Sequence, residues 1–148
     1  MKYQLAQFNI GTIKDTMDSA LMHGFASRLD EINALAEAHE GFVWRLQDES
    51  GNATGILEYE DPFQLVNMSV WESVETLKQY TYQSMHRELL RDRKQWFHAM
   101  QEMHYVLWWV PTGHRPTVAE AKERLALLQR LGSTAEAFDF KKPFPPPH

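Results

Sequence analysis

The sequence predicts an α+β domain, in which an antiparallel four-stranded sheet carries helices on one face and a further helix follows at the C-terminus. Three observations support this prediction. Short β-favouring segments alternate with longer segments of helical periodicity. Their order is β-α-β-β-α-β before the last helix, which is the ferredoxin-like pattern. The 148 residues suffice for one domain with its own core.

The first third of the chain is predicted to contain two strands around a helix. Residues 3–9 alternate as a strand does. Asp18 or Ser19 could cap the helix that follows. Its apolar side chains recur every three or four residues, at Phe25, Leu29, Ile32 and Ala36. Gly41 is a typical helix-ending residue, and the second strand is predicted directly after it, over residues 42–47.

The middle of the chain begins with a polar segment, residues 48–62, that is rich in turn formers and is predicted to be a long loop. The third strand is predicted over residues 66–71, which are strongly β-favouring. Ser73 then starts a helix with Val74, Leu77 and Tyr80 on one side. A second helical run is predicted over residues 84–100.

The C-terminal part is predicted to contain a fourth strand over residues 104–111 and a last helix. Thr117 caps this helix, and Glu120 three positions later completes the pattern of a capping box. Gly132 closes the helix, and residues 138–140 could form a short edge strand. Residues 141–148 are proline-rich, so they can form neither helix nor central strand. We therefore expect one domain over residues 1–140 and a tail that is either frayed or laid over a partner.

Composition and charge exclude several classes of function. The chain has no cysteine, which rules out disulfides, thiolate metal sites and a cysteine nucleophile. Its net charge of −5 argues against nucleic-acid binding, which needs a basic surface. No stretch approaches the roughly 20 apolar residues that span a bilayer, and the N-terminus has no signal-peptide core. We expect a cytoplasmic protein that binds neither membrane nor nucleic acid.

The aromatic content of 12% includes five tryptophans, most of them on predicted strands. A four-stranded sheet covered by helices on one face leaves its other face in need of a partner. The pattern therefore predicts a homodimer in which some of this aromatic surface packs between subunits. No nucleotide-binding or hydrolase motif is present in the sequence, and no cofactor or metal is expected.

Four segments carry a resemblance to a known family: residues 41–45, 67–73, 96–97 and 107–116. They resemble a bacterial family of unknown function that belongs to the dimeric α+β barrel superfamily, alongside the antibiotic biosynthesis monooxygenases. The resemblance covers residues 3–140 and implies a dimeric α+β barrel fold. Among the catalytic relatives are oxygenases that use neither flavin nor metal.

The same resemblance implies catalytic roles for Asn67, Trp71 and His86. Asn67 and Trp71 look like the pair of quinone-forming oxygenases, with Asn67 bonded to a substrate oxygen and Trp71 as a stacking wall. Strand periodicity places both on one face with Ser69, while Val66, Met68 and Val70 form an apolar face. His86 follows on the next helical run and could accept a proton. Each could instead be an ordinary core or surface residue.

Five further residues are candidates for ligand binding, each with a structural alternative. Arg45 on a half-buried strand needs an anion, either a ligand or a carboxylate such as Glu58, Glu60 or Glu72. Tyr82 could donate a phenolic proton, or pack with its hydroxyl in water. The aromatic candidates, which could equally be core residues, are Trp44, Trp96 and Trp108.

Three functions remain open from the sequence. The first is a small-molecule-binding homodimer that oxygenates an aromatic or planar apolar substrate without a cofactor. The second is a dimer that only binds a small apolar or aromatic ligand, or that has a purely structural role. The third is a haem-binding protein, for which Asn9 is the nearest match to the first-strand asparagine of haem-degrading relatives.

Overall fold

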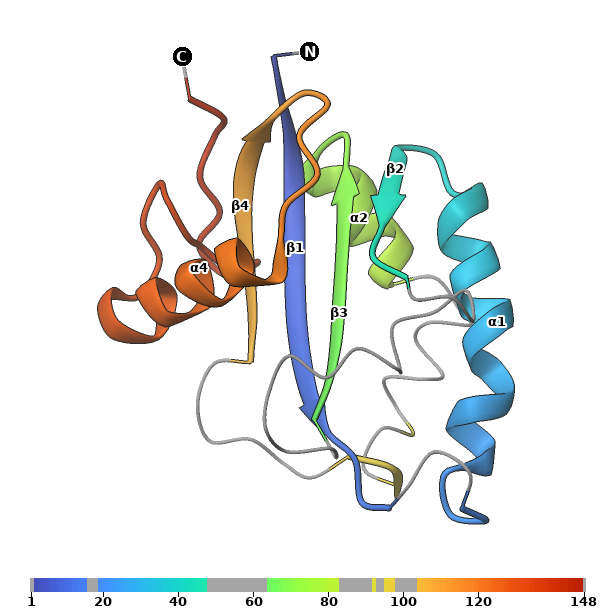
Figure 1. Ribbon diagram of the computed structural model, residues 1–148. Helices are drawn as coiled ribbons and strands as arrows, with labels where there is room; N and C mark the ends of the chain where they lie inside the picture. Colours follow the sequence, from blue (N-terminus) through green and yellow to red (C-terminus); the bar gives the residue numbers. More distant parts are fainter. Residues whose placement is uncertain are drawn as a thin grey trace.

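A computed structural model of the chain describes residues 2–15, 19–47, 64–82, 92, 95–97 and 104–147. Its labelled helices and strands, in chain order, are β1 (Tyr3–Thr12), α1 (His23–Ala38), β2 (Phe42–Arg45), β3 (Gln64–Trp71), α2 (Val74–Thr81), β4 (Tyr105–Pro111) and α4 (Val118–Leu131) (Figure 1). The predicted loop over residues 48–62 and most of the helical run over residues 84–100 lie outside the described residues.

The four strands form one sheet in the order β2-β3-β1-β4, and every neighbouring pair is antiparallel. The predicted α+β, ferredoxin-like architecture is therefore confirmed. β1 and β3 are the inner strands, and β1 runs to Thr12, three residues beyond its predicted end. Residues that lie directly opposite each other on neighbouring strands share a face of the sheet. Their side chains therefore form rows that run across the strands.

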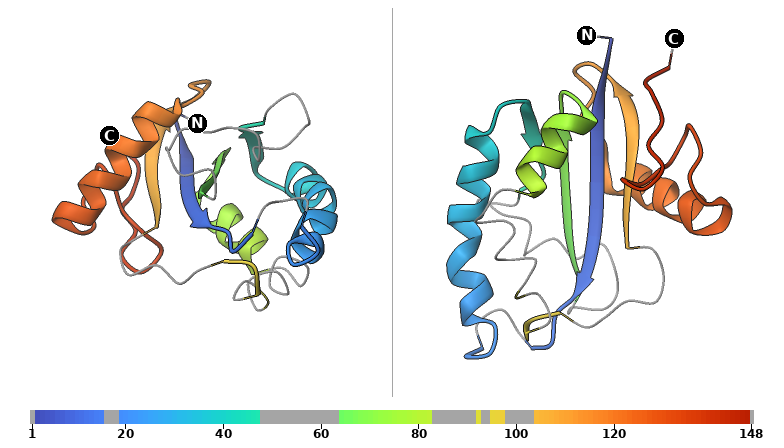
Figure 2. Two further views of the ribbon diagram at one scale, coloured as in Figure 1. Left: turned by 60° about the horizontal axis from the view of Figure 1, so that its bottom comes forward. Right: turned by 180° about the vertical axis from the view of Figure 1, so that it is seen from behind.

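The two faces of the sheet are covered by different helices. α1 and α2 pack on the face that carries Leu5, Trp71 and Leu107. α4 packs on the opposite face, against Phe8, Trp108 and their neighbours. Seen from behind, α2 lies in front of the sheet and α4 lies beyond it (Figure 2). The sequence predicted that this face packs against a second subunit. It is buried in part by the chain's own last helix, and the homodimer stays a prediction.

The caps predicted at Ser73 and Thr117 are confirmed, but the cap predicted at Asp18 or Ser19 is not: Asp18 lies outside the described residues, and the N-cap of α1 is Met22, which has no side-chain cap. The Ser73 hydroxyl accepts a hydrogen bond from the Thr76 amide, and the Thr76 hydroxyl accepts one from the Ser73 amide, so α2 begins with a capping box. The Thr117 hydroxyl accepts from the Glu120 amide at the start of α4. The predicted capping box would also need the Glu120 carboxylate to accept from the Thr117 amide. The carboxylate instead accepts from the Trp108 indole at 2.9 Å and contacts the His114 ring at 2.7 Å.

The C-terminal strap, which we define as residues 137–144, folds back on the chain's own sheet. Phe138 and Leu107 exchange both backbone hydrogen bonds, so the strap extends β4 at its outer edge as predicted. The strap then returns over the α1/α2 face, where the carbonyl of Phe144 accepts from the Trp109 indole at 2.9 Å. Its end is therefore neither frayed nor extended away from the chain.

Candidate ligand-binding site

Polar side chains interrupt the apolar sheet face beneath α1 and α2. Asn9 lies directly opposite Asn67, and Gln7 lies directly opposite Ser69, on the two inner strands. We call these four residues the polar floor. Asn67 is exposed although it sits in the middle of a central strand, while Ser69 is buried. An exposed amide on an inner strand marks a place where the helices leave the sheet accessible.

Hydrogen bonds connect three members of the polar floor to Trp71. Gln7 Nε2 donates to Asn67 Oδ1 at 2.6 Å and to Ser69 Oγ at 2.8 Å. Trp71 Nε1 also donates to Ser69 Oγ at 2.8 Å. The Ser69 oxygen thus accepts two bonds, so its own O–H must point elsewhere as a donor. The Asn67 oxygen is likewise engaged, which leaves its NH₂ group as the part that a ligand would meet.

Arg45 places a positive charge beside this network. It lies opposite Ser69 in the sheet, and its Nε is 2.7 Å from the Glu37 carboxylate on α1. The sequence suggested Glu58, Glu60 or Glu72 as the carboxylate partner; Glu58 and Glu60 lie outside the described residues, and a described partner is Glu37. The Arg45 side chain is only 11% exposed, whereas that of Glu37 is 49% exposed. A guanidinium held this close to the polar floor favours an oxygen-rich or anionic ligand.

Trp71 is a core residue at the edge of the polar floor. Its side chain is 1% exposed, and the Tyr80 ring stacks on it with centroids 5.1 Å apart. Phe42 and His39 approach the indole edge-on. The predicted role as a stacking wall for substrate does not match this placement, because the indole is enclosed by protein. What Trp71 contributes here is the hydrogen bond that orients Ser69.

Tyr80 closes the same cluster from α2. Its hydroxyl donates to the carbonyl of Ile32 at 3.2 Å, which ties α2 to α1. Burial raises the pKa of Tyr80 to about 12, and the opposing influence of the Arg45 charge is smaller. Tyr80 is therefore a neutral hydrogen-bond donor at physiological pH. It supports the aromatic end of the site rather than exchanging protons there.

The other predicted residues do not gather at the polar floor. Trp108 is fully buried beneath α4, and Trp44 is half-buried on that same face, where Arg115 lies over its ring at 5.9 Å. Trp96 packs with Phe25 in a separate cluster at the far end of α1. The three tryptophans therefore take up the structural alternative that the sequence left open. Tyr82, just beyond α2, is 54% exposed.

His86, the predicted proton acceptor, lies outside the described residues. Its role stays a prediction. Within the described ranges, no group of three or more His, Asp and Glu side chains is arranged to hold a metal ion. No helix in those ranges combines the length and the hydropathy needed to cross a membrane.

Sequence reasoning missed Gln7 as a site residue and did not settle the register of Asn9. The available signal was the period of two along the first strand, which puts Gln7 and Asn9 on one face. What the sequence could not supply was the pairing of that strand with the third, which brings both residues opposite Ser69 and Asn67. The polar floor depends on this non-local register.

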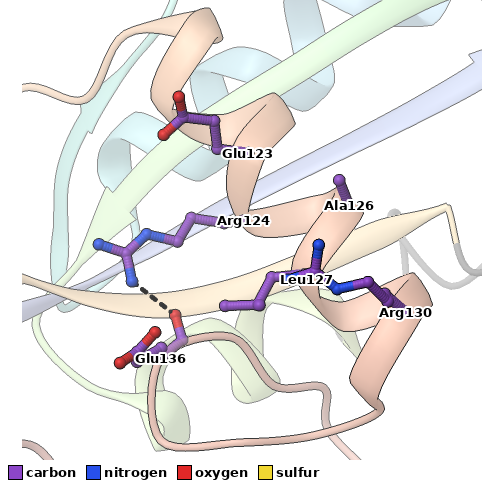
Figure 3. A pocket seen from close by; sticks show the side chains of 6 residues that line it. All are labelled: Glu123, Arg124, Ala126, Leu127, Arg130 and Glu136. Atoms are coloured by element: carbon purple, nitrogen blue, oxygen red, sulfur yellow. Dashed lines mark hydrogen bonds between the residues drawn. The ribbon is translucent and has the colours of Figure 1, made fainter.

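A second hollow lies on the opposite side of the molecule, outside the polar floor. It is an open surface depression between α4 and the turn that precedes the strap, in which Arg124 donates to the carbonyl of Glu136 at 2.8 Å (Figure 3). Its lining residues are Glu123, Arg124, Ala126, Leu127, Arg130 and Glu136. Charges of both signs alternate around it and no buried polar group points into it, so it lacks the features of a built ligand site.

Comparisons with known proteins place the chain in a family and show no assigned activity. A family model described as a domain of unknown function (DUF3291) matches residues 4–148. Among curated proteins, none matches.

The similar solved structures share little sequence with the chain. One is a protein of unknown function from Nitrosomonas europaea, with 14% identity, a TM-score of 0.47, and coverage of 78% of this chain and 95% of that one. Another is SnoaB, a cofactor-independent oxygenase from Streptomyces nogalater, with 13% identity, a TM-score of 0.45, and coverage of 80% and 98%. A third is a dabb family protein with a ferredoxin-like fold from Mesorhizobium loti, with 11% identity, a TM-score of 0.43, and coverage of 77% and 98%.

Proposed function

The chain belongs to the DUF3291 family of domains of unknown function, and we propose that it binds a planar aromatic small molecule carrying a hydrogen-bonding oxygen. The observation that carries this proposal is the arrangement of the polar floor. Gln7 occupies the Asn67 oxygen, and Gln7 and Trp71 together occupy the Ser69 oxygen. The groups that this leaves for a ligand include the Asn67 NH₂ and the Ser69 O–H, two donors that match a phenolate or carbonyl oxygen.

The surroundings of the polar floor support an aromatic ligand. On one side lies the cluster of Trp71, Tyr80 and Phe42, and on the other lies a second cluster that includes Ile13 and Leu65. A few hydrogen-bonding groups placed in apolar surroundings are typical of sites for small organic ligands. Arg45 adds a positive potential that stabilises a ligand oxygen as it becomes anionic.

The reaction that we propose for this site is oxygenation of an electron-rich aromatic without flavin or metal. A base, for which His86 is the candidate, would remove a proton from a ring CH₂ group, and the resulting carbanion would reduce O₂ directly. One oxygen atom would become a new ring carbonyl, and the other would leave as water with the two hydrogens of that carbon. The donors of Asn67 and Ser69 would hold the developing oxyanion, and Arg45 would balance its charge.

Ligand binding tests the proposal. Naphthalene and 2-naphthol differ by one oxygen, so calorimetric titration of both isolates the contribution of the donors. We expect 2-naphthol to bind about fivefold or more tightly than naphthalene, and Asn67→Ala to remove the difference. Asn33→Ala on α1, outside the polar floor, is the matched control and should keep it. Equal binding of the two probes to the unaltered protein would reject the proposal.

Turnover separates an enzyme from a binding protein. An anthrone offers a reactive CH₂ group, and oxygen consumption with quinone formation is read in the presence and absence of the protein. We expect His86→Ala to abolish the catalysed rate while 2-naphthol still binds. Binding without any catalysed oxygen uptake would favour the non-enzymatic alternative. Addition of hemin tests the third function, for which a Soret band lost in His86→Ala would be required.

A further inference from the structure

The row of the sheet that contains Asn67 and Asn9 continues to a third polar side chain. Asn9 lies directly opposite Asn67 on β3 and directly opposite Tyr105 on β4. Directly opposite residues share a face, so the three side chains lie in one line on the α1/α2 face. We propose that Tyr105 is a further ligand-contacting residue, and that Tyr105 and Asn67 together select ligands with an oxygen at each end of the long axis. This inference rests on the proposed function.

The hydrogen bonding of Tyr105 leaves its hydroxyl with a proton to donate. The Tyr105 oxygen accepts the backbone N–H of Phe140 at 3.2 Å. The N–H occupies an acceptor position, and among the described residues none accepts the phenolic O–H, which can therefore donate to a ligand. Tyr105 is half-buried, and the Phe140 ring packs against it with centroids 5.8 Å apart. The strap thus fixes the position of the hydroxyl, which reduces the entropy lost when a ligand binds.

Tyr105 also faces the end of α2. Burial raises its pKa, and the neighbouring Asp139 carboxylate and Tyr82 phenol act in the same direction, against the Phe140 hydrogen bond. Tyr82 is therefore close enough to Tyr105 to interact electrostatically. Tyr105 bounds the site on its β4 side, as Asn67 bounds it toward β3. Tyr105 stays a neutral donor through the physiological range.

The spacing of the strands sets the length of the ligand. β3 and β4 are separated by β1, so their backbones lie two strand spacings apart, about 10 Å. Donors at the two ends of such a row suit a fused-ring compound with oxygens at opposite ends. A compound with one oxygen can satisfy only one of them, and it leaves the other donor without a partner.

The test compares 2-naphthol with 2,6-naphthalenediol, which carries a second oxygen at the far end of the ring system. We expect the diol to bind the unaltered protein about fivefold more tightly than 2-naphthol. Tyr105→Phe should remove that preference, because the variant has no donor for the second oxygen of the diol. Equal affinity for the two probes, or a preference that survives in Tyr105→Phe, would overturn the inference. Failure of 2-naphthol itself to bind would instead refute the proposed function.

A control distinguishes direct contact from an effect through the strap. Trp109→Phe removes the indole bond to the Phe144 carbonyl, so it loosens the end of the strap but keeps both the Tyr105 hydroxyl and the Phe140 amide that donates to it. We expect this variant to keep the preference for the diol. If Trp109→Phe loses the preference as Tyr105→Phe does, the strap rather than the Tyr105 hydroxyl determines selectivity, and the inference is wrong.

Discussion

The indole nitrogen of Trp71 donates to the hydroxyl of Ser69 at 2.8 Å, across two residues of the same strand. Both side chains lie on the face beneath α1 and α2, and both are buried. This bond links the aromatic cluster to the polar floor, because Ser69 also accepts from Gln7. Stability and ligand geometry therefore depend on the same hydroxyl.

Ser69→Ala should destabilise the protein by about 1–3 kcal/mol, because it leaves a buried indole N–H without an acceptor. Trp71→Phe added to Ser69→Ala should cost less than Trp71→Phe alone, with a coupling of at least about 0.5 kcal/mol. Urea unfolding of the single and double variants measures this. Ser27→Ala on the exposed face of α1 is the control and should stay within about 0.5 kcal/mol. If the losses of stability in the two single variants simply added up in the double variant, the hydrogen bond between Trp71 and Ser69 would contribute nothing.

Elements that depend on local signals were predicted well from the sequence. Ser73 and Thr117 cap their helices as expected, because a hydroxyl acts on amides only three residues away. The alternation of Val66, Met68 and Val70 correctly identified an apolar face, which packs in the core with α4. Such signals are contained within one element, so they do not depend on how distant segments pair.

Features that depend on distant segments were predicted less well. Glu37 on α1, which was not predicted from the sequence, forms an ion pair with Arg45, because the strand after Gly41 turns back along that helix. For Trp71 the sequence left a ligand wall and a core residue both open, and in the fold Tyr80 from α2 stacks on its ring. Neither contact follows from the period of a single strand. Side-chain enclosure is decided by the approach of helices, which the sequence pattern leaves open.

Stability should fall steeply in alkaline solution because of Tyr80. Burial raises its pKa to about 12 in the folded protein, against about 10 in the unfolded chain. Below pH 10 both states are protonated and the stabilising contribution is complete. Between pH 10 and 12 the unfolded chain loses the proton first, so stability declines, by about 2–3 kcal/mol in total.

Urea unfolding at pH values from 8 to 11.5 tests this dependence. Tyr80→Phe should be less stable below pH 10, since the Ile32 carbonyl loses its donor. Its stability should then fall less between pH 10 and 11.5 than that of the unaltered protein. The raised pKa of Tyr105 leaves a residual slope in the variant. If the stability of the two proteins fell equally with pH over this range, the pKa of Tyr80 would not be raised by folding.

Gly41 should tolerate no side chain, whereas Gly113 should tolerate one at moderate cost. Both have positive φ, +88° and +92°, where alanine is strained by about 1–2 kcal/mol. A Cβ at Gly41 would also collide with the Thr76 side chain of the α2 capping box, while no described atom lies within 4 Å of one at Gly113. Thermal unfolding should therefore rank Gly41→Ala below Gly113→Ala by at least about 1 kcal/mol. Equal losses of stability in the two variants would mean that the strain at positive φ, and not the contact with Thr76, determines the cost of a Cβ.

The C-terminal strap should stabilise its own chain rather than a partner. Ending the chain after Lys142 removes Phe144, whose carbonyl accepts from Trp109 and whose ring packs on Phe138 at 6.0 Å between centroids. We expect a loss of about 1–3 kcal/mol in urea unfolding, from a buried donor left unpaired and from lost apolar contact.

Two further measurements on this truncation separate the alternatives for the tail. A chain ending after Phe144 is the control, because residues 145–147 are exposed, and its stability should stay within about 0.5 kcal/mol of the full chain. Light scattering should give both truncated chains the same oligomeric state as the full chain, because the described strap contacts lie within one chain. If ending at Lys142 changed the oligomeric state without changing the stability of the fold, the tail would be acting as an arm over a partner.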